Sequence, residues 1–286
     1  MEKLKFNNIS LGLYEKALPD NMGWEERLSL AHKAGYDFME ISIDESDDRI
    51  ERLKWDKTKM RKLREAADIT GIPLLTMCLS ANRRFPIGSG YPEIQKKGME
   101  ILGSAIQFAS SAGIRIVQIA GYDVLMNEEV STVKSKETFA VNLEKNVALA
   151  ASLGIMLAIE NVDIDFGNSI DKLMYFIGEI KSPWLQIYPD IGNLTAMRQN
   201  VAEQLLSGKT HIAAIHAKDT HDGVVRRVPF GEGIVDFVSA FKTLKNICFS
   251  GPVLLEMWAD DSKDNFEIVK NSKKWIHEKL EQAGYF

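Results

Sequence analysis

Cysteine is scarce in this sequence: only two occur among 286 residues, Cys78 and Cys248. They lie far apart and form no pair with metal-ligand spacing, so neither a disulfide framework nor a structural zinc site is expected. A chain of this length buries enough apolar surface in one core to fold without such cross-links. The two cysteines therefore predict reduced thiols in a cytoplasmic protein.

Long apolar runs and an excess of basic charge are also missing. No stretch approaches the roughly 18 apolar residues that a membrane-spanning helix needs, and residues 1–10 contain no apolar core of signal-peptide length. The formal net charge is −5, whereas a general nucleic-acid-binding protein normally carries a strong basic excess. We therefore expect neither a membrane nor a nucleic acid as a partner.

One unit recurs along the chain: an amphipathic helical pattern, a glycine, and a short apolar run. The glycines lie at intervals of 36, 42 and 41 residues, and glycine commonly ends a helix in the left-handed conformation. The runs that follow are apolar almost throughout, which is typical of parallel strands covered on both faces. The four glycines are Gly35, Gly71, Gly113 and Gly154.

The apolar runs predict eight strands with helices between them. Eight βα units in 286 residues are typical of an α/β fold of the (β/α)8 TIM-barrel class. An open doubly wound sheet usually has fewer strands and a G-x-G-x-x-G turn after the first, and that turn is missing here. We therefore predict a single barrel domain over residues 1–286. The predicted strands are 10–14, 37–42, 74–80, 116–121, 155–160, 185–190, 212–218 and 252–258.

Four consecutive predicted strands carry an ionisable residue near their carboxyl ends. Catalytic groups of TIM barrels lie at those ends, so the four side chains should share one arc of the barrel mouth. Three carboxylates so close together need a cation to stay ionised, and with an imidazole they suit Mn²⁺, Co²⁺, Zn²⁺ or Mg²⁺. We therefore predict a divalent metal site. Its ligands are Glu160, Asp190, His216 and Glu256.

Three further residues lie near the predicted mouth. Glu15 and Glu40 each stand near a strand end, where a carboxylate either orients a substrate or metal ligand or stabilises the fold. The sequence leaves both roles open. Trp258 follows Glu256 by two residues and is expected to form a wall of the pocket.

Segments along almost the whole chain resemble the xylose-isomerase-like barrels, and more narrowly the L-ribulose-5-phosphate 3-epimerases (also described as L-xylulose-5-phosphate 3-epimerases) of ascorbate and pentose catabolism. Several of these segments lie outside the predicted metal site. The resemblance implies a ketopentose phosphate as substrate, and a homodimer. The segments are LGLYEKALP (11–19), MEISIDESDDRIERLKW (39–55), MCLSANRRFPIGS (77–89), IQFASSAGIRIVQIAGYDV (106–124), YPDIGNL (188–194), HAKDT (216–220), VPFGEGIVDF (228–237) and LLEMW (254–258).

The resemblance also implies roles for individual residues. The metal ligands of that family and of the related free-sugar 3-epimerases match the four residues predicted above. Two positions depart from the pattern: Asn82 stands where family members carry a histidine, and Asn193 where the free-sugar enzymes do. An amide can hydrogen-bond a substrate hydroxyl but cannot titrate near neutrality. We therefore expect Asn193 to bind substrate without transferring a proton.

Inverting a carbon beside a ketone requires removal of a weakly acidic proton and its return to the opposite face. A divalent metal that chelates O2 and O3 would polarise the carbonyl and hold the resulting enediolate in its cis form. Two acid/base groups are then needed, one on each face. Glu160 and Glu256 come from strands separated by two others, so we expect these two residues to be catalytic.

Cationic residues near the mouth are candidates for binding the phosphate. Lys218 follows His216 by two residues and points to the same side if the strand continues that far. Arg84 follows predicted strand three and Arg226 precedes the VPFGEG segment, and arginine suits bidentate phosphate binding. A surface ion pair is the alternative for each arginine.

Three other functions stay open at this level. An aldose–ketose isomerase of the hexulose-6-phosphate or hydroxypyruvate type would use the same enediolate. A nuclease of the endonuclease IV type shares the barrel but uses three metals and several more histidines than the five present here. A non-catalytic sugar-phosphate-binding protein would not need two glutamates and a metal.

Overall fold

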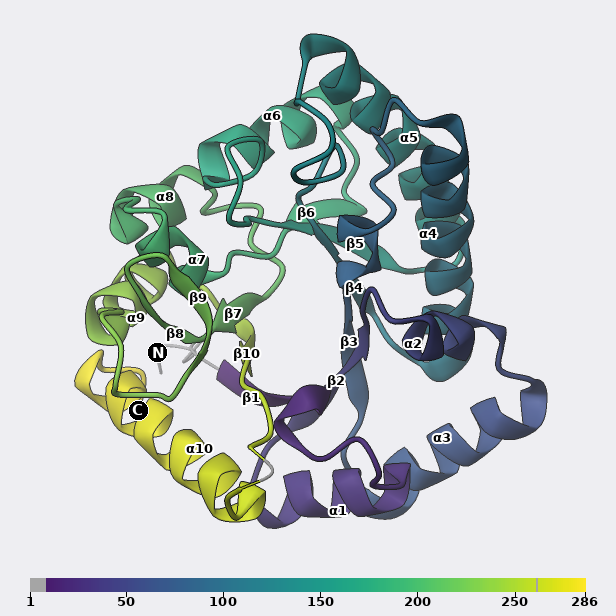
Figure 1. The fold of residues 1–286 in the computed structure, drawn as a ribbon. Coiled ribbons are helices and arrows are strands. Elements are labelled where there is room, and N and C mark those ends of the chain that lie inside the picture. Colours follow the sequence, from purple (N-terminus) through teal and green to yellow (C-terminus); the bar gives the residue numbers. More distant parts are fainter. Residues whose placement is uncertain (1–8, 261) are drawn as a thin grey trace, which may run out of the picture.

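The computed structural model describes residues 9–260 and 262–286. Within them, parallel strands form a ring and α-helices surround it (Figure 1). The ring strands are β1 (Ile9–Tyr14), β2 (Phe38–Ile43), β3 (Leu74–Leu79), β4 (Ile116–Ala120), β5 (Met156–Glu160), β6 (Leu185–Ile187), β7 (Ile215–Ala217) and β10 (Gly251–Leu255).

The helices follow the strands in alternation. The α-helices are α1 (Trp24–Lys33), α2 (Asp47–Glu51), α3 (Lys57–Thr70), α4 (Pro92–Ala112), α5 (Val133–Ser152), α6 (Ile170–Ile180), α7 (Ile191–Ala196), α8 (Val201–Ser207), α9 (Phe237–Asn246) and α10 (Asn265–Gln282). Short 3-10 helices are η1 (Glu15–Ala17), η2 (Arg52–Lys54) and η3 (Ser80–Arg83). After β7, the strands β8 (Asp219–His221) and β9 (Val224–Val228) form an antiparallel hairpin.

The ring of strands is closed. The eight strands follow the order β6–β5–β4–β3–β2–β1–β10–β7, and every neighbouring pair is parallel. Between β6 and β7, parallel bridges join Ile187 to Ile212 and Asp190 to His216. The predicted (β/α)8 barrel is thereby confirmed.

The glycines of the repeated unit end helices as predicted. Gly71 closes α3 with a φ of 72°, and Gly113 closes α4 with a φ of 83°. In this left-handed region a side chain would strain the backbone, so glycine lets the chain turn at once into the next strand. At the other end of a helix, the side chain of Asp56 accepts a hydrogen bond from the backbone N–H of Lys59 and caps α3.

Five of the predicted strands, the third, fourth, sixth, seventh and eighth, end one to three residues earlier than expected, and for two of them the local chemical reason is clear. β6 ends at Ile187 because Pro189 has no N–H to give to a ladder and Asp190 already begins α7. β7 ends at Ala217 because the chain turns into the β8–β9 hairpin. Both changes leave the residues that follow free to lie at the mouth of the barrel.

Apolar side chains on the outer face of the strands pack against the helices and form the main core. The inner face holds smaller apolar clusters, one of which contains Phe38 and Leu254 and another Ile116 and Ala158. Above these clusters the barrel interior becomes polar. Among the described residues, no helix has the length and apolar character to cross a bilayer. The expectation that no signal peptide is present concerns residues 1–10, most of which lie outside the described residues.

Candidate metal centre and active site

The four predicted metal ligands meet at one end of the barrel. Their ligand atoms all lie within 4.8 Å of one another, and all four residues are buried. Each comes from a different strand or the loop directly after it, which is why residues far apart in sequence converge here. The four are Glu160 at the end of β5, Asp190 before α7, His216 in β7 and Glu256 after β10.

Asp190 is held by the segment around it. Its Oδ1 accepts a hydrogen bond of 2.8 Å from the backbone N–H of Asn193 and so caps α7. Asn161 binds the backbone of Asp190 on both sides: its Oδ1 accepts from the N–H at 2.8 Å, and its Nδ2 donates to the carbonyl at 3.0 Å. With the backbone and one oxygen fixed, Oδ2 is left to face the cluster.

His216 lies between two carboxylates in the barrel interior. Its Nδ1 is 2.6 Å from Oε1 of Glu160, and its Nε2 is 2.9 Å from Oε1 of Glu40. The ring packs against Tyr188, with ring centroids 4.4 Å apart. One nitrogen therefore faces the ligand group and the other faces away from it.

Lys218 lies inside the same cluster. Its Nζ is 2.6 Å from Oδ2 of Asp190 and 2.9 Å from Oε2 of Glu256, and only 3% of the residue is exposed. Burial by itself lowers the pKa of Lys218, but the two carboxylates outweigh burial and hold that pKa above its usual value. The side chain is therefore an ammonium ion that points to the same side as His216, as its spacing predicts.

The charges of the cluster fit a divalent cation. Three carboxylates face a single lysine, and burial raises the pKa of Asp190 despite the attraction of Lys218. For Glu256, Lys218 and His216 overcome burial and lower the pKa. Carboxylate and imidazole donors that are buried, close together and short of positive charge suit Zn²⁺, Mn²⁺, Co²⁺ or Mg²⁺.

Gln118 contributes to the site, although sequence reasoning did not single it out. Its Oε1 accepts a hydrogen bond of 3.0 Å from the backbone N–H of Leu79, which fixes the amide so that Nε2 donates to Oε2 of Glu160. The signal in the sequence was a single amide within the apolar strand IVQIA. Gln118 therefore orients one of the two predicted catalytic glutamates.

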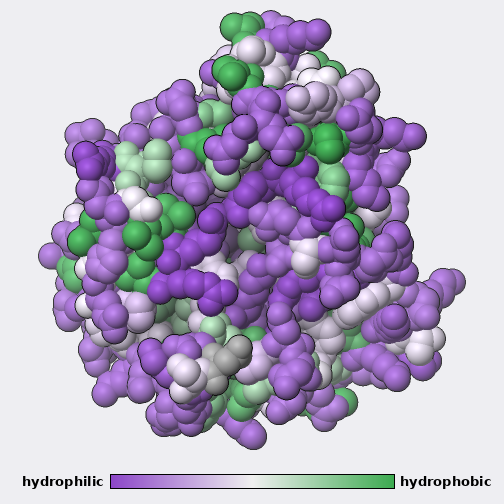
Figure 2. Space-filling view, in the orientation of Figure 1, coloured by the Kyte–Doolittle hydropathy of each residue, from purple (hydrophilic) through white to green (hydrophobic). Residues whose placement is uncertain are grey.

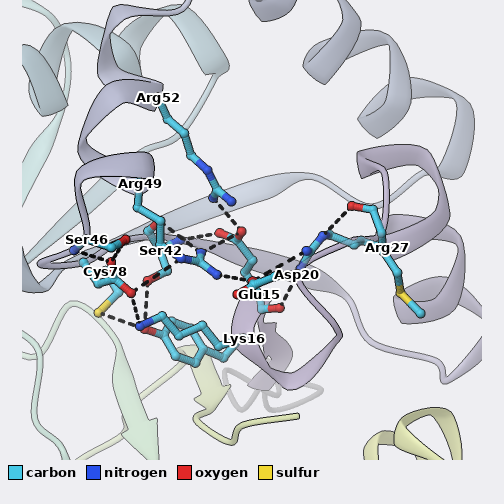
Figure 3. Close-up of polar contacts among 12 residues, drawn as sticks. Glu15, Lys16, Asp20, Arg27, Ser42, Ser46, Arg49, Arg52 and Cys78 are labelled. Carbon is cyan, nitrogen blue, oxygen red and sulfur yellow. Dashed lines mark hydrogen bonds and ion pairs between the residues drawn. The ribbon is translucent and has the colours of Figure 1, made fainter. Parts of the chain in front are cut away.

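Glu15, a candidate for substrate binding whose role the sequence left open, lies in a separate ion-pair cluster near the ends of β1 and β2 (Figure 3). It is fully buried, and its carboxylate contacts Arg49 at 2.8 Å and Arg52 at 2.5 Å. Its second oxygen accepts a hydrogen bond of 2.7 Å from the N–H of Ser42. Donors from the protein thus already occupy both oxygens.

The predicted phosphate-binding arginines lie in different settings. Arg84 is half exposed and pairs with Asp47 at 2.7 Å. Arg226, on β9, is partly buried. Burial raises the pKa of Glu256, Lys218 and His216 lower it most, and the charge of Arg226 lowers it by a smaller amount. Of the two arginines, Arg226 therefore has the closer electrostatic link to the ligand group.

Asn193 and Trp258 complete the predicted set. The Nδ2 of Asn193 donates to the carbonyl of Asn161 at 2.9 Å, so the amide supports the loop that carries Asp190. Trp258 meets Tyr14 edge to face and lines a cavity of about 800 Å³ together with Phe230 and other residues. Figure 2 shows mostly hydrophilic side chains around a hollow near the centre of this face.

Comparisons with known proteins agree with this geometry. Residues 28–279 match the family model described as xylose isomerase-like TIM barrel. The chain is 44% identical over 276 residues to the L-ribulose-5-phosphate 3-epimerase UlaE of Escherichia coli (strain SMS-3-5 / SECEC), with 96% of each chain covered.

Solved structures share the fold at lower identity. An L-ribulose 3-epimerase superposes with a TM-score of 0.78 at 19% identity, covering 96% of this chain and 95% of that one. The IOLI protein with a bound zinc atom superposes with a TM-score of 0.80 at 19% identity, covering 97% and 99%. This protein therefore belongs to the xylose isomerase-like TIM barrel family and, within it, to the L-ribulose-5-phosphate 3-epimerases.

Proposed function

We propose that the protein is a metal-dependent epimerase that inverts C3 of a ketopentose phosphate, interconverting L-xylulose 5-phosphate and L-ribulose 5-phosphate. The observation that carries this proposal is the buried group in which Glu160 and Glu256 flank Asp190 and His216. The 44% identity to an L-ribulose-5-phosphate 3-epimerase over nearly the whole chain supports the choice of substrate.

The proposed metal ligands are Glu160, Asp190, His216 and Glu256. The zinc atom in the structurally similar IOLI protein supports a divalent cation as cofactor, with Zn²⁺, Mn²⁺, Co²⁺ and Mg²⁺ as candidates. When bound, such a cation supplies Lewis acidity that stabilises the negative oxygen formed when the proton leaves C3.

Glu160 and Glu256 carry out the proton transfers in this proposal. One carboxylate accepts the C3 proton on one face of the substrate, and the other donates a proton to the opposite face, with the roles exchanged in the reverse direction. Gln118 orients Glu160 through Oε2, and Lys218 holds Glu256 at 2.9 Å. Because the group is buried, bulk water is kept from the reacting carbon.

We propose that Arg226 makes the main contact with the substrate phosphate. The positive charge of Arg226 lowers the pKa of Glu256, and Arg226 lies on strand β9 of the hairpin that follows β7. Lys218 and Arg84 remain further candidates, but each would have to exchange an existing ion pair for the phosphate. Trp258, which lines the cavity of about 800 Å³ described above, would form an apolar wall beside the substrate.

The test is to incubate the metal-loaded protein with L-xylulose 5-phosphate in D₂O and follow the carbons by NMR. We expect deuterium at C3 together with the appearance of L-ribulose 5-phosphate. Exchange at C1 would replace the proposal with an aldose–ketose isomerase. No exchange at any carbon, with metal confirmed bound, would rule out this substrate pair.

We further propose a cytoplasmic enzyme that acts as a homodimer and consists of one domain over residues 1–286. The free thiols of Cys78 and Cys248 agree with a reducing compartment. Analytical ultracentrifugation at micromolar concentration would test the dimer, because a monomeric mass would contradict it.

A further inference from the structure

Glu40 is a fully buried carboxylate that lies beside the ligand group without belonging to it. Its exposure is 0%, and its Oε1 lies 2.9 Å from Nε2 of His216. Its Oε2 accepts hydrogen bonds from the hydroxyls of Thr76 at 2.7 Å and Tyr188 at 3.1 Å. All three partners come from other strands of the barrel or the segments that follow them, so Glu40 is held on every side.

The setting of Glu40 differs from that of Glu15, the other fully buried glutamate near these strand ends. Glu15 is neutralised by Arg49 and Arg52, whereas within residues 9–260 and 262–286 no lysine or arginine pairs with Glu40. Burial of a carboxylate costs free energy unless a partner pairs with it, and for Glu40 that partner is the imidazole of His216. Glu40 is therefore linked directly to one of the proposed metal ligands, whereas Glu15 is not.

The strand geometry directs Glu40 toward His216. The register between β2 and β3 shifts between Met39 and Glu40, which places Thr76 opposite Glu40. Such irregularities in a ladder commonly re-aim a side chain near a functional site. The result is that Nε2 of His216 meets Glu40, while Nδ1 stays on the side of Glu160.

We propose that Glu40 is a positioning residue for the metal site. By accepting the Nε2–H of His216, it fixes the ring orientation and the tautomer in which Nδ1 has a free lone pair for the metal. Histidine ligands generally donate their other ring N–H to such a partner, and loss of the partner typically weakens metal binding about 10–100-fold. This inference rests on the proposed function, because it presumes that the ligand group takes a divalent cation.

The test compares Glu40→Gln with Glu15→Gln and the unchanged protein. Zn²⁺ affinity is measured at fixed pH by competition with a chromophoric chelator, and Co²⁺-loaded samples are compared by visible absorption. We expect Glu40→Gln to bind Zn²⁺ about 10–100-fold more weakly and to show a changed Co²⁺ spectrum. Glu15→Gln should lose stability, because it leaves two arginines poorly paired, while its Zn²⁺ affinity stays unchanged.

Each outcome bears on the proposal. Equal Zn²⁺ affinity in Glu40→Gln and the unchanged protein, or an equal loss in both variants, would overturn it. If Glu40→Gln fails to fold, ¹⁵N NMR of the zinc-loaded unchanged protein decides instead: a protonated Nε2 on His216 supports the proposal, and zinc on Nε2 refutes it. If the unchanged protein binds no Zn²⁺, the proposed function fails as well. If the unchanged protein catalyses epimerisation and Glu40→Gln binds Zn²⁺ with the same affinity, only the proposed role of Glu40 fails.

Discussion

The ammonium nitrogen of Lys218 lies 2.6 Å from Oδ2 of Asp190, inside the group of carboxylates that we propose binds metal. The same nitrogen lies 2.9 Å from Oε2 of Glu256. Lysine thus neutralises part of the charge of this site from within the protein. A divalent cation would add to that neutralisation, so the stability of the cluster should depend on both cations.

Replacing Lys218 by methionine removes the charge but keeps most of the side-chain volume. We expect the free energy of unfolding to fall by about 3–5 kcal/mol in the presence of a chelator, because two buried carboxylates lose their partner. With saturating Zn²⁺ the loss should be smaller. Urea unfolding under both conditions measures the difference, and an identical loss with and without metal would contradict this account.

Replacing Glu160 or Glu256 by glutamine should lower kcat for epimerisation by about 10²–10⁴-fold, because one face of C3 then lacks its acid or base. Since each variant keeps one carboxylate, it should still exchange the C3 hydrogen of one epimer with D₂O. NMR of the recovered substrate, with metal content measured in parallel, checks this. Retained epimerisation in either variant would exclude the two-glutamate mechanism.

Removing the metal with a chelator should abolish turnover and lower the melting temperature. Binding to the native state alone stabilises a protein by about 2.7 kcal/mol when free ligand reaches 100 times its dissociation constant. The melting temperature should therefore rise with added Zn²⁺ and fall back to its metal-free value when the metal is removed. An unchanged rate and melting temperature after verified removal would disprove the metal assignment.

Replacing Arg226 by methionine should raise KM for the ketopentose phosphate by about 10–100-fold, because a hydrogen bond to a charged group contributes roughly 1.5–3 kcal/mol. Turnover of unphosphorylated L-ribulose, where measurable, should not change. The Arg61→Met variant serves as control, since Arg61 lies on α3, is largely exposed and pairs with Glu65 on the same helix. A loss of kcat with unchanged KM would show that Arg226 does not bind the phosphate.

Asp44 should make stability depend on pH. Burial raises its pKa, but hydrogen bonds from Lys16 and Ser46 outweigh burial and lower the pKa to about 2. Asp44 therefore stabilises the folded state above the unfolded pKa of about 3.9, and this contribution is lost as the pH falls toward the folded value. Asp44→Asn should cost stability at pH 7, and the cost should shrink below about pH 4.

Urea unfolding of the unchanged protein and of Asp44→Asn across that pH range tests the prediction. Asp47→Asn is the matched control, because Asp47 is largely exposed and pairs only with the half-exposed Arg84. It should have almost no effect at any pH. A cost for Asp44→Asn that stays constant down to pH 3 would show that its carboxylate does not carry the effect.

Much of this architecture was readable from the sequence because it depends on short-range patterns. Apolar runs of strand length after helix-ending glycines predicted the eight strands, and the structure confirms the barrel. The four residues at the ends of strands five to eight were predicted to converge, and they lie within 4.8 Å of one another. Parallel strands in a closed barrel bring their carboxyl ends together whatever the details of packing.

The sequence by itself could not determine which side chains pair with one another. Glu40 and His216 are 176 residues apart, and their contact depends on the strand register across the barrel. Glu15 and Glu40 looked alike at this level, yet the structure places one against arginines and the other against a histidine. Local patterns determined the strands and the arc of ionisable groups, whereas tertiary packing alone decided the partner of each buried charge, because that partner comes from a distant segment.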